Sequence, residues 1–445
     1  MASLPSLAPA LQRVLTTAAA VAGRTSGFVQ RQSKLTGPLF VQTLVFGWLN
    51  QPRSTLEQLC QMAASLGVAI TPQGLDARFD EPAACCLEQV LQAAVGEVIA
   101  ADAVPLELLT RFAAVTIHDS STIVLPNELA ARWRGNGGNS PTNTAAAVNL
   151  QLRWNLTNGA LEGPLLHDGR GQDTTGPLAE SPVAPGTWRL ADLGYFCLDH
   201  LAALTAQQAF WLRRLAFQTA LFAPDGGRLD LRALLDAAPT LDGPILLGVH
   251  HRLPCRLLAL RVPDEVAEQR RRRMREEARV KGQTVSAERL AVAAWTILIT
   301  NVPPAQLSLA DALALLRARW QIELLLKLWK QHGAIDEWRT QNPWRILCEL
   351  YAKLLAVLMQ HWCMLTGAWA SPARSLVKAA QVVRRFCPLL ALALEEVLPG
   401  LTVDAVIDLL ARILATGGHL NRRKAKPNTD QLLHDPALLG YGGLA

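Results

Sequence analysis

The chain has 445 residues, half of them hydrophobic, and its formal net charge is +6 at pH 7. This length allows two or three packed units, and the hydrophobic content excludes wholesale disorder. The positive charge favours a polyanionic partner such as DNA, although an excess of this size is weak evidence by itself. The eight cysteines form no Cys-x-x-Cys pair, which favours free thiols over a zinc site or disulfides.

Two features of the sequence argue against a membrane-bound or secreted protein. Residues 1–27 lack a charged segment followed by an uninterrupted apolar one, so we expect no signal peptide. The most apolar stretch, Leu354–Ala370, is interrupted by Gln360 and His361 and is expected to be a core helix. These features predict a cytoplasmic protein without a membrane partner.

Residues 1–105 are predicted to be helical. Ser54 is positioned to cap a helix over Thr55–Leu66, and Glu57 three residues later would complete a capping box. Thr71 can cap a second helix over Pro72–Phe79, because proline is tolerated in the first turn of a helix. Two helices joined by a glycine-containing turn are typical of a helix-turn-helix, whose second helix contacts DNA.

The candidate DNA contacts in this region lie on the second helix. They are Gln73, Asp76 and Arg78. An ordinary αα-hairpin within a helical bundle produces the same sequence pattern and remains the alternative.

From about residue 110 to residue 215 the pattern changes to strands. Three segments predict an antiparallel meander, in which Thr157-Asn158-Gly159 supplies a hairpin turn. A strand, a helix and another strand follow. The predicted strands are Phe112–Asp119, Ala145–Leu156, Leu161–His167, Thr187–Asp192 and Ala209–Leu215, and the predicted helix is Leu198–Gln208.

Two of these strands end in an aspartate, Asp119 in the first and Asp192 in the fourth. An ionised carboxyl group at the end of an apolar strand is costly to desolvate unless it pairs with a cation or binds a metal. Both aspartates are therefore candidate metal ligands.

The rest of the chain predicts further strands and then helices. The predicted strands are Ile245–Val249, Cys255–Val262 and Trp295–Thr300, and the predicted late helices are Trp344–Thr366, Ser375–Arg385, Leu389–Val397 and Val403–Ala415.

A third acidic candidate, Glu323, lies in the helical segment Arg319–Lys330. At 3.6 residues per turn, Arg319, Glu323 and Lys330 fall on one face beside a strip that should face a core. A surface salt bridge is the alternative. With the two aspartates, Glu323 would complete an oxygen-only site for Mg²⁺, and paired ions of this kind support phosphoryl transfer.

These motifs, in this order, resemble the DDE insertion-sequence transposases of the IS-four type. The signature of that family is Tyr-x2-Arg-x3-Glu-x6-Lys, and Arg319, Glu323 and Lys330 stand at the required spacings. Leu316 departs from the signature, because it occupies the position of the tyrosine. The resemblance runs from about Phe28 to Trp362. The surroundings that agree with it are Ile117–Thr122, Leu190–Phe196 and Leu298–Pro304.

The resemblance implies a multidomain α/β fold with an RNase H-like catalytic core. Residues 1–105 would be a helical DNA-binding region and residues 106–340 the catalytic domain, with a mainly β insertion at about 217–305. Residues 341–445 would be a helical C-terminal region with a basic tail, His419–Pro427. Asp119, Asp192 and Glu323 would be the catalytic residues and would bind two Mg²⁺ ions, for which Mn²⁺ could substitute.

Several basic and aromatic residues are candidate DNA contacts near such a site. Arg319 and Lys330 would donate charge-assisted hydrogen bonds to phosphate. The resemblance implies that Trp295 stacks on a flipped base during hairpin formation, and Trp320 suggests a similar role. A core tryptophan on a strand is the alternative for Trp295.

A run of five arginines among six residues, Arg270–Arg275, lies on a predicted helix. Arg271, Arg272 and Arg273 are candidate phosphate contacts. A solvated helix face is the alternative, because glutamates surround the run.

The implied function is cut-and-paste DNA transposition, in which DNA cleavage and strand transfer through a hairpin excise and insert an insertion sequence. The implied partners are terminal inverted repeats and target DNA, bound by a homodimer in the bacterial nucleoid. Two alternatives stay open. One is a DNA-binding descendant whose active site is worn at Leu316, and the other is a different metal-dependent DNA nuclease built on the same carboxylates.

Overall fold

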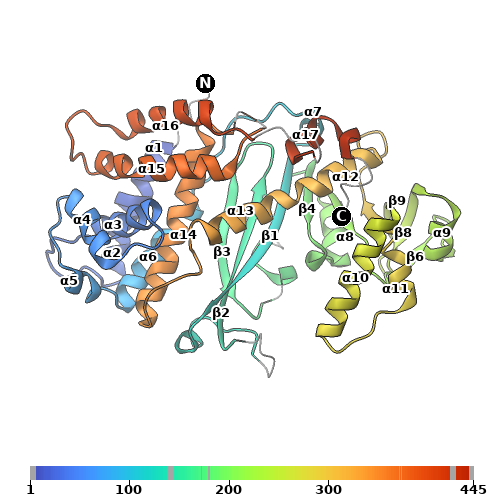
Figure 1. Ribbon diagram of the computed structural model, residues 1–445, viewed down its shortest axis with the longest axis horizontal. Helices are drawn as coiled ribbons and strands as arrows, with labels where there is room; N and C mark the ends of the chain where they lie inside the picture. Colours follow the sequence, from blue (N-terminus) through green and yellow to red (C-terminus); the bar gives the residue numbers. More distant parts are fainter. Residues whose placement is uncertain are drawn as a thin grey trace.

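A mixed ten-stranded sheet runs from a helical body into a smaller unit, whose strands form one end of the sheet (Figure 1). The structure is a computed structural model that describes residues 7–137, 144–171, 173–178, 181–369, 371, 373–420 and 427–439. The strand order is β3-β2-β1-β4-β5-β10-β9-β8-β6-β7. The strands are β1 Ala114–Leu125, β2 Ala146–Asn155, β3 Leu161–Asp168, β4 Thr187–Ala191, β5 Phe210–Arg214, β6 Leu221–Phe222, β7 Arg228–Leu229, β8 Thr240–Leu247, β9 Leu253–Arg261 and β10 Trp295–Thr300.

The first five strands in this order form an antiparallel meander joined to two parallel strands. β1 pairs antiparallel with β2, and β2 pairs antiparallel with β3. On its other edge β1 pairs parallel with β4, and β4 pairs parallel with β5. This is the RNase H-like arrangement, and it confirms the predicted fold class.

The hairpin between β2 and β3 depends on Gly159. Its φ of +77° is a left-handed conformation that residues with side chains rarely adopt. A Cβ atom at this position would lie 2.5 Å from Cδ2 of Leu365 and 2.7 Å from Cδ2 of Trp369, both in the helical body. The turn predicted at residues 157–159 is confirmed, and its tip packs closely against the helices.

β1 is longer than predicted, because it does not end at Asp119. Pairing with β2 continues through Thr122 to Leu125, so Asp119 lies in the middle of the strand. The parallel pairing with β4 does end beside Asp119, at His118. The polar residues after Asp119 resemble a turn in the sequence, but their pairing with a neighbouring strand decides their conformation.

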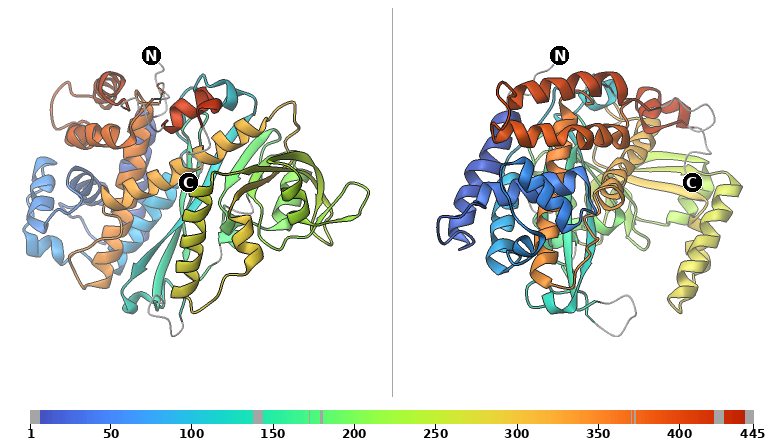
Figure 2. Two further views of the ribbon diagram at one scale, coloured as in Figure 1. Left: turned by 45° about the vertical axis from the view of Figure 1, so that its right-hand side comes forward. Right: turned by 60° about the vertical axis from the view of Figure 1, so that its left-hand side comes forward.

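The predicted insertion extends the catalytic sheet instead of forming a sheet of its own. β10 pairs with β5 on one edge and with β9 on the other, and β8 and β6 follow. Buried residues here form a second apolar cluster that includes Trp211, Leu247 and Ile299. Figure 2 shows helix α10 (Asp264–Val280) beside the strands of this unit.

The N-terminal and C-terminal helices form one body, although they lie at opposite ends of the chain. α14 packs against α3 and α6, and α15 packs against α3, α14 and α16. Figure 1 shows these blue, orange and red helices together on one side of the sheet. The predicted domain boundaries at residues 105 and 340 stay predictions. The helices of this body are α1 Leu7–Gln12, α2 Ala19–Thr25, α3 Gly37–Asn50, α4 Leu56–Ser65, α5 Pro72–Asp76, α6 Glu81–Val95, α14 Pro343–Leu365, α15 Leu376–Leu394 and α16 Val403–Gly417, with a π-helical turn at Arg13–Ala18.

The remaining helices lie along the sheet and in the smaller unit. They are α7 Glu107–Thr110, α8 Leu198–Ala206, α9 Leu231–Ala237, α11 Ala287–Val292, α12 Leu309–Ala318, α13 Trp320–Gln331 and α17 Thr429–His434.

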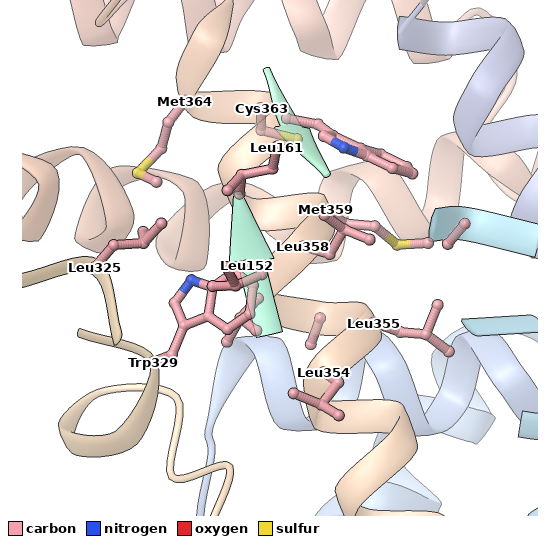
Figure 3. Packing of buried hydrophobic residues seen from close by; sticks show 14 of the residues in the cluster. Leu152, Leu161, Leu325, Trp329, Leu354, Leu355, Leu358, Met359, Cys363 and Met364 are labelled. Atoms are coloured by element: carbon pink, nitrogen blue, oxygen red, sulfur yellow. The ribbon is translucent and has the colours of Figure 1, made fainter. Parts of the chain in front are cut away.

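Helix α14 lies at the centre of the main core. Within the described part of the chain it alone is long and apolar enough to cross a membrane, but its apolar stretch is completely buried. Figure 3 shows Leu355, Leu358 and Met359 of α14 gathered near Trp329 of α13 and Leu152 of β2. The structure confirms the predicted core helix.

Two local predictions about helices were wrong. Thr55 caps α4 with Gln58 completing the capping box, one residue later than predicted. The Ser54 hydroxyl instead donates to the Gln51 carbonyl oxygen at 2.8 Å. The two helices predicted on either side of Pro388 are a single helix, α15, because its buried face continues past the proline. The predicted tail His419–Pro427 lies mostly outside the described residues.

Removal of residues 1–105 should prevent the remaining chain from folding cooperatively. The deletion takes α3 and α6 away from α14, and the apolar face that α14 buries against them would be exposed to water. Thermal melting of the fragment and of the full chain, followed by circular dichroism, measures this effect. A fragment that melts in one sharp transition at the temperature of the full chain would contradict the single-body arrangement.

Candidate active site

The register of the parallel strands aligns three charged residues. The last parallel pair of β1 and β4 joins His118 to Ala191, so Asp119 and Asp192 are the next residues along. The register of β4 with β5 places Arg214 beside Asp192 in the same row. Because side chains alternate between the faces of a sheet, residues in one row share a face. The sheet therefore brings both predicted aspartates together.

Helix α13 carries the third predicted acid across this row. It packs on β1 and crosses the sheet in Figure 1. The segment around Glu323 was predicted as one helix, but α12 and α13 meet at Arg319, which is the C-cap of one and the N-cap of the other. Arg319 keeps helical dihedral angles (φ −49°, ψ −35°), so the chain stays helical through the junction. Arg319 and Glu323 therefore remain one turn apart.

Arg319 links two of the three acids. Its Nη2 atom lies 2.7 Å from Oε1 of Glu323 and 3.9 Å from Oδ1 of Asp192. The Arg319 side chain is only 13% exposed, whereas Asp192 is about half exposed. The pair is therefore not the exposed surface salt bridge of the alternative interpretation, because its cation is nearly buried.

Asp119 lies deeper than the other two acids. The pKa of its carboxyl group is raised to about 6, mainly by burial and to a smaller extent by the nearby carboxylates of Glu323 and Asp192. The Ser120 backbone N–H donates to Oδ1 at 2.9 Å, and this bond and the Arg319 charge act in the opposite direction. The three acids and Arg319 therefore lie within electrostatic range of one another.

The donor set suits a hard divalent cation. All three acids offer carboxylate oxygens, which Mg²⁺ and Mn²⁺ prefer. No group of three His, Cys, Asp or Glu side chains in the described ranges is already gathered as metal ligands. The Arg319 guanidinium lies close to both Glu323 and Asp192, so binding a cation requires this ion pair to open.

Lys330 lies at the other end of α13. Its Nζ atom donates to the Thr122 carbonyl oxygen of β1 at 3.0 Å and lies 3.9 Å from Asp336. Thr122 is three residues beyond Asp119 on the same strand. Lys330 is therefore held along β1, about two helical turns from Glu323.

Arg214 is a candidate that the sequence analysis missed. It is exposed at the carboxyl end of β5 and has no hydrogen-bond or ion-pair partner within the part of the chain that the structure describes. Desolvation lowers the pKa of its guanidinium, and the Arg319 charge lowers it further, whereas Asp192 and Glu323 raise it. The available signal was its place at the end of the strand predicted after Asp192.

The two candidate tryptophans differ in exposure. Trp295 begins β10 at the same end of the sheet as Arg214, is half-buried, and packs against two apolar clusters. Trp320 follows Arg319, is 42% exposed, and has Lys327 Nζ 4.8 Å from its ring centroid. Trp320 can offer a free ring face, whereas part of Trp295 serves the core.

The arginine run lies on α10 and is largely paired with glutamates of the same helix. Arg271 lies 3.4 Å from Glu268, and Arg273 lies 2.8 Å from Glu277. Arg272 is exposed and has no ion-pair partner among the described residues. The solvated helix face therefore accounts for most of the run, and Arg272 is the residue with a free charge.

The predicted helix-turn-helix residues have structural partners. Arg78 donates to the Phe28 carbonyl oxygen at 3.1 Å and lies over the Phe28 ring. Asp76 accepts a hydrogen bond from Arg345 at 2.9 Å, and Gln73 is exposed. The second helix, α5, has only five residues. These contacts support the alternative of an ordinary helical hairpin, and DNA contact by these residues stays a prediction.

Comparison with known proteins identifies the family. Residues 110–359, more than half of the chain, match the model described as Transposase DDE domain. The chain belongs to this family. The DDE transposases are DNA-cleaving and strand-joining enzymes, so membership confirms the predicted enzyme class and makes DNA the partner. Enzymes of this family generally use divalent metal ions.

Named relatives are also transposases of insertion sequences. The transposase for insertion sequence element IS231B of Bacillus thuringiensis subsp. berliner is 25% identical over 358 residues, which are 75% of this chain and 74% of the relative. The transposase for IS1151 of Clostridium perfringens is 24% identical over 367 residues, 77% of each chain. The putative transposase InsL for IS186A of Escherichia coli (strain K12) is 35% identical over 187 residues, 38% of this chain and 49% of the relative.

The variant Arg319→Gln should raise the pKa of Asp119 above about 6. The guanidinium favours the charged form of the Asp119 carboxyl group, so its loss makes that group harder to ionise. Titration of the carboxyl carbon by NMR, assigned with Asp119→Asn, measures the change. The exposed Arg228 on β7 provides the control Arg228→Gln, which should leave the titration unchanged. An unchanged or lower pKa in Arg319→Gln would reject the electrostatic link between these residues.

Proposed function

We propose that this DDE transposase excises and inserts its element by cut-and-paste transposition through a DNA hairpin. The observation that carries the proposal is the shared row of Asp119 and Asp192 beneath Glu323, with Arg319 linking the helix to the sheet. We assign catalysis to these three acids. Their carboxylates offer acceptor oxygens at one point on the sheet, where a phosphodiester could be cut.

We assign two Mg²⁺ ions to the same three carboxylates, with Mn²⁺ as a possible substitute. When bound, such ions supply Lewis-acid activation of the attacking oxygen and stabilise the leaving oxygen. The chain's own contribution is to position the three carboxylates and to supply Arg319, which can exchange a carboxylate partner for a phosphate. With the acids holding cations, Arg319 would be released from Glu323 and Asp192 and could bind phosphate.

The cations around the acids would hold the DNA backbone. Arg319 and Arg214 both lie near Asp192, and both can donate to phosphate oxygens of the cleaved strand. Lys330 would bind a phosphate farther along β1, because its amino group is fixed beside Thr122. The arrangement places charge-assisted donors both at the acids and beyond them.

The aromatic residues would stack on bases of the bent DNA. We propose that Trp295 stacks on a base flipped out during hairpin formation, and that the exposed ring of Trp320 supports a neighbouring base. Arg272, with Arg271 and Arg273 beside it on α10, would contact further phosphates of the DNA backbone.

The partners follow from the reaction. The terminal inverted repeats and the target are both double-stranded DNA, and two ends must be handled together, so we propose a homodimer in the synaptic complex and an association with the nucleoid. Gln73 and Arg78 would contribute to end recognition only if the contact of Arg78 with Phe28 opens.

One observation favours a second candidate function. Leu316 stands where the family signature has a tyrosine, so a phosphate-contacting hydroxyl is absent. A DNA-binding descendant that no longer cuts would fit this change. The electrostatically linked acids and Arg319 favour the active enzyme. The DNA next to the gene separates the active transposase from a different metal-dependent nuclease, because terminal inverted repeats flank a transposable element.

The variant Glu323→Ala should abolish DNA nicking and leave DNA binding nearly intact. The substitution removes a proposed metal ligand but no proposed base contact, and the loss of a negative charge does not oppose DNA binding. A Mg²⁺-dependent nicking assay on a duplex carrying the element's end, run beside a gel shift, measures both. The control Glu288→Ala removes an exposed carboxylate of α11 and should nick normally. Normal nicking by Glu323→Ala would remove Glu323 from the proposed site.

The variant Trp295→Ala should spare first-strand nicking and slow hairpin formation. A lost base stack of about 1–3 kcal/mol corresponds to a slowing of about five- to a hundred-fold in that step. The rates of both steps on one substrate, with thermal melting of each protein, test the assignment. A tryptophan with a purely structural role would instead cost about 3–5 kcal/mol of stability and depress both steps together.

A further inference from the structure

A cleft separates the end of α13 from the N-terminal helices. Its volume is about 480 Å³, and its walls come from segments far apart in the chain. Gln51 and Arg53 line one side together with the first turn of α4, and Gln331, His332 and Arg339 line the other. Arg384 of α15 completes the wall. The cleft therefore exists only because the N-terminal and C-terminal helices pack together.

The walls of this cleft are basic. Three arginines and a histidine line it, and no acidic residue does. Arg339 is exposed and has no ion-pair partner in the described ranges, and the Nε atom of Arg384 is buried without a hydrogen-bond partner. Arg53 is held by two hydrogen bonds to Glu337, at 2.6 and 2.7 Å. Because Glu337 holds Arg53, the exposed Arg339 is the cation that the cleft offers to an anion, among neutral glutamine and threonine side chains.

The cleft is joined to the candidate active site by the exposed face of α13. Trp320, Leu324, Lys327 and Gln331 are exposed and recur at helical spacing, so they form one stripe. Glu323 lies beside this stripe near its start, and Gln331 at its end lines the cleft. At 1.5 Å per residue these two residues are about 12 Å apart along the helix. At about 3.4 Å per nucleotide, that distance spans about three or four nucleotides of one DNA strand.

We propose that this basic cleft binds the sugar-phosphate backbone of duplex DNA, about three or four nucleotides from the phosphate that is cut. The inference rests on the proposed function, because it takes Glu323 as part of the cutting site. Guanidinium groups match phosphate oxygens in geometry as well as in charge. Among the described residues that line the cleft there is no Phe, Tyr or Trp, so we assign its contact to the backbone and not to stacked bases.

The variant Arg339→Ala tests the proposal, because Arg339 makes no intramolecular ion pair that its loss would break. Affinity is measured at several salt concentrations, both on a random-sequence duplex and on one carrying the element's end. Loss of one phosphate contact lowers the slope of log K against log salt by about 0.9 on both duplexes. Arg339→Lys should restore most of the slope. The matched control Arg228→Ala removes an exposed arginine at the far edge of the sheet and should leave it unchanged.

A phosphate-ethylation interference experiment locates the contact. In the wild-type protein, ethylation about three or four nucleotides from the cut should weaken binding, and in Arg339→Ala that position should lose its effect. An unchanged slope, or interference only at other positions, overturns the inference. Inorganic phosphate that competes for Arg339 while the DNA slope stays constant would assign the cleft to a small anion and also overturn it. Nicking by the wild-type protein, tested separately, decides the proposed function independently of these results.

Discussion

The contact of the Arg319 guanidinium with Glu323 and Asp192 couples the two halves of the candidate site. Glu323 belongs to a helix and Asp192 follows a strand, so their relative position depends on how α13 sits on the sheet. The guanidinium offsets the repulsion between carboxylates that would otherwise oppose that packing. Under the proposed function, a cation bound by the acids would take over this role, and the same arginine would become a donor for phosphate.

The two faces of the sheet bury different kinds of side chain. On the face that α13 and α14 cover, Leu152 and Trp154 of β2 are buried in the main core. On the other face of β2, Arg153 is almost completely buried, and it donates to Glu162 and to the carbonyl oxygen of Leu178. Burial lowers the pKa of the Arg153 guanidinium. Burial also lowers the pKa of the neighbouring Arg189 guanidinium, which falls to about 9. Buried arginines of this kind depend on nearby acceptors, and the Leu178 carbonyl oxygen supplies one for Arg153.

The basic cleft and the row of acids depend on the same packing. Lys330 and Gln331 end α13 between β1 and the N-terminal helices, so one helix reaches both places. The ion pair between Arg53 and Glu337 and that between Asp76 and Arg345 connect the N-terminal helices to the segment around α14. Exposed pairs add little stability individually, but these fix the orientation of a surface that apolar packing already brings together.

Some features were fixed by local sequence alone. The spacing of Arg319 and Glu323 places them one turn apart in any helix, and apolar runs with strong turn residues defined the strands from Ala114 to Arg214. Other features depend on contacts between distant segments, which a local sequence pattern does not specify. The length of β1 depends on its partner strand, and the union of the terminal helices depends on buried surface shared by distant segments. Arg214 was recognised only in the structure, because strand register is a property of a pair of strands and not of one segment.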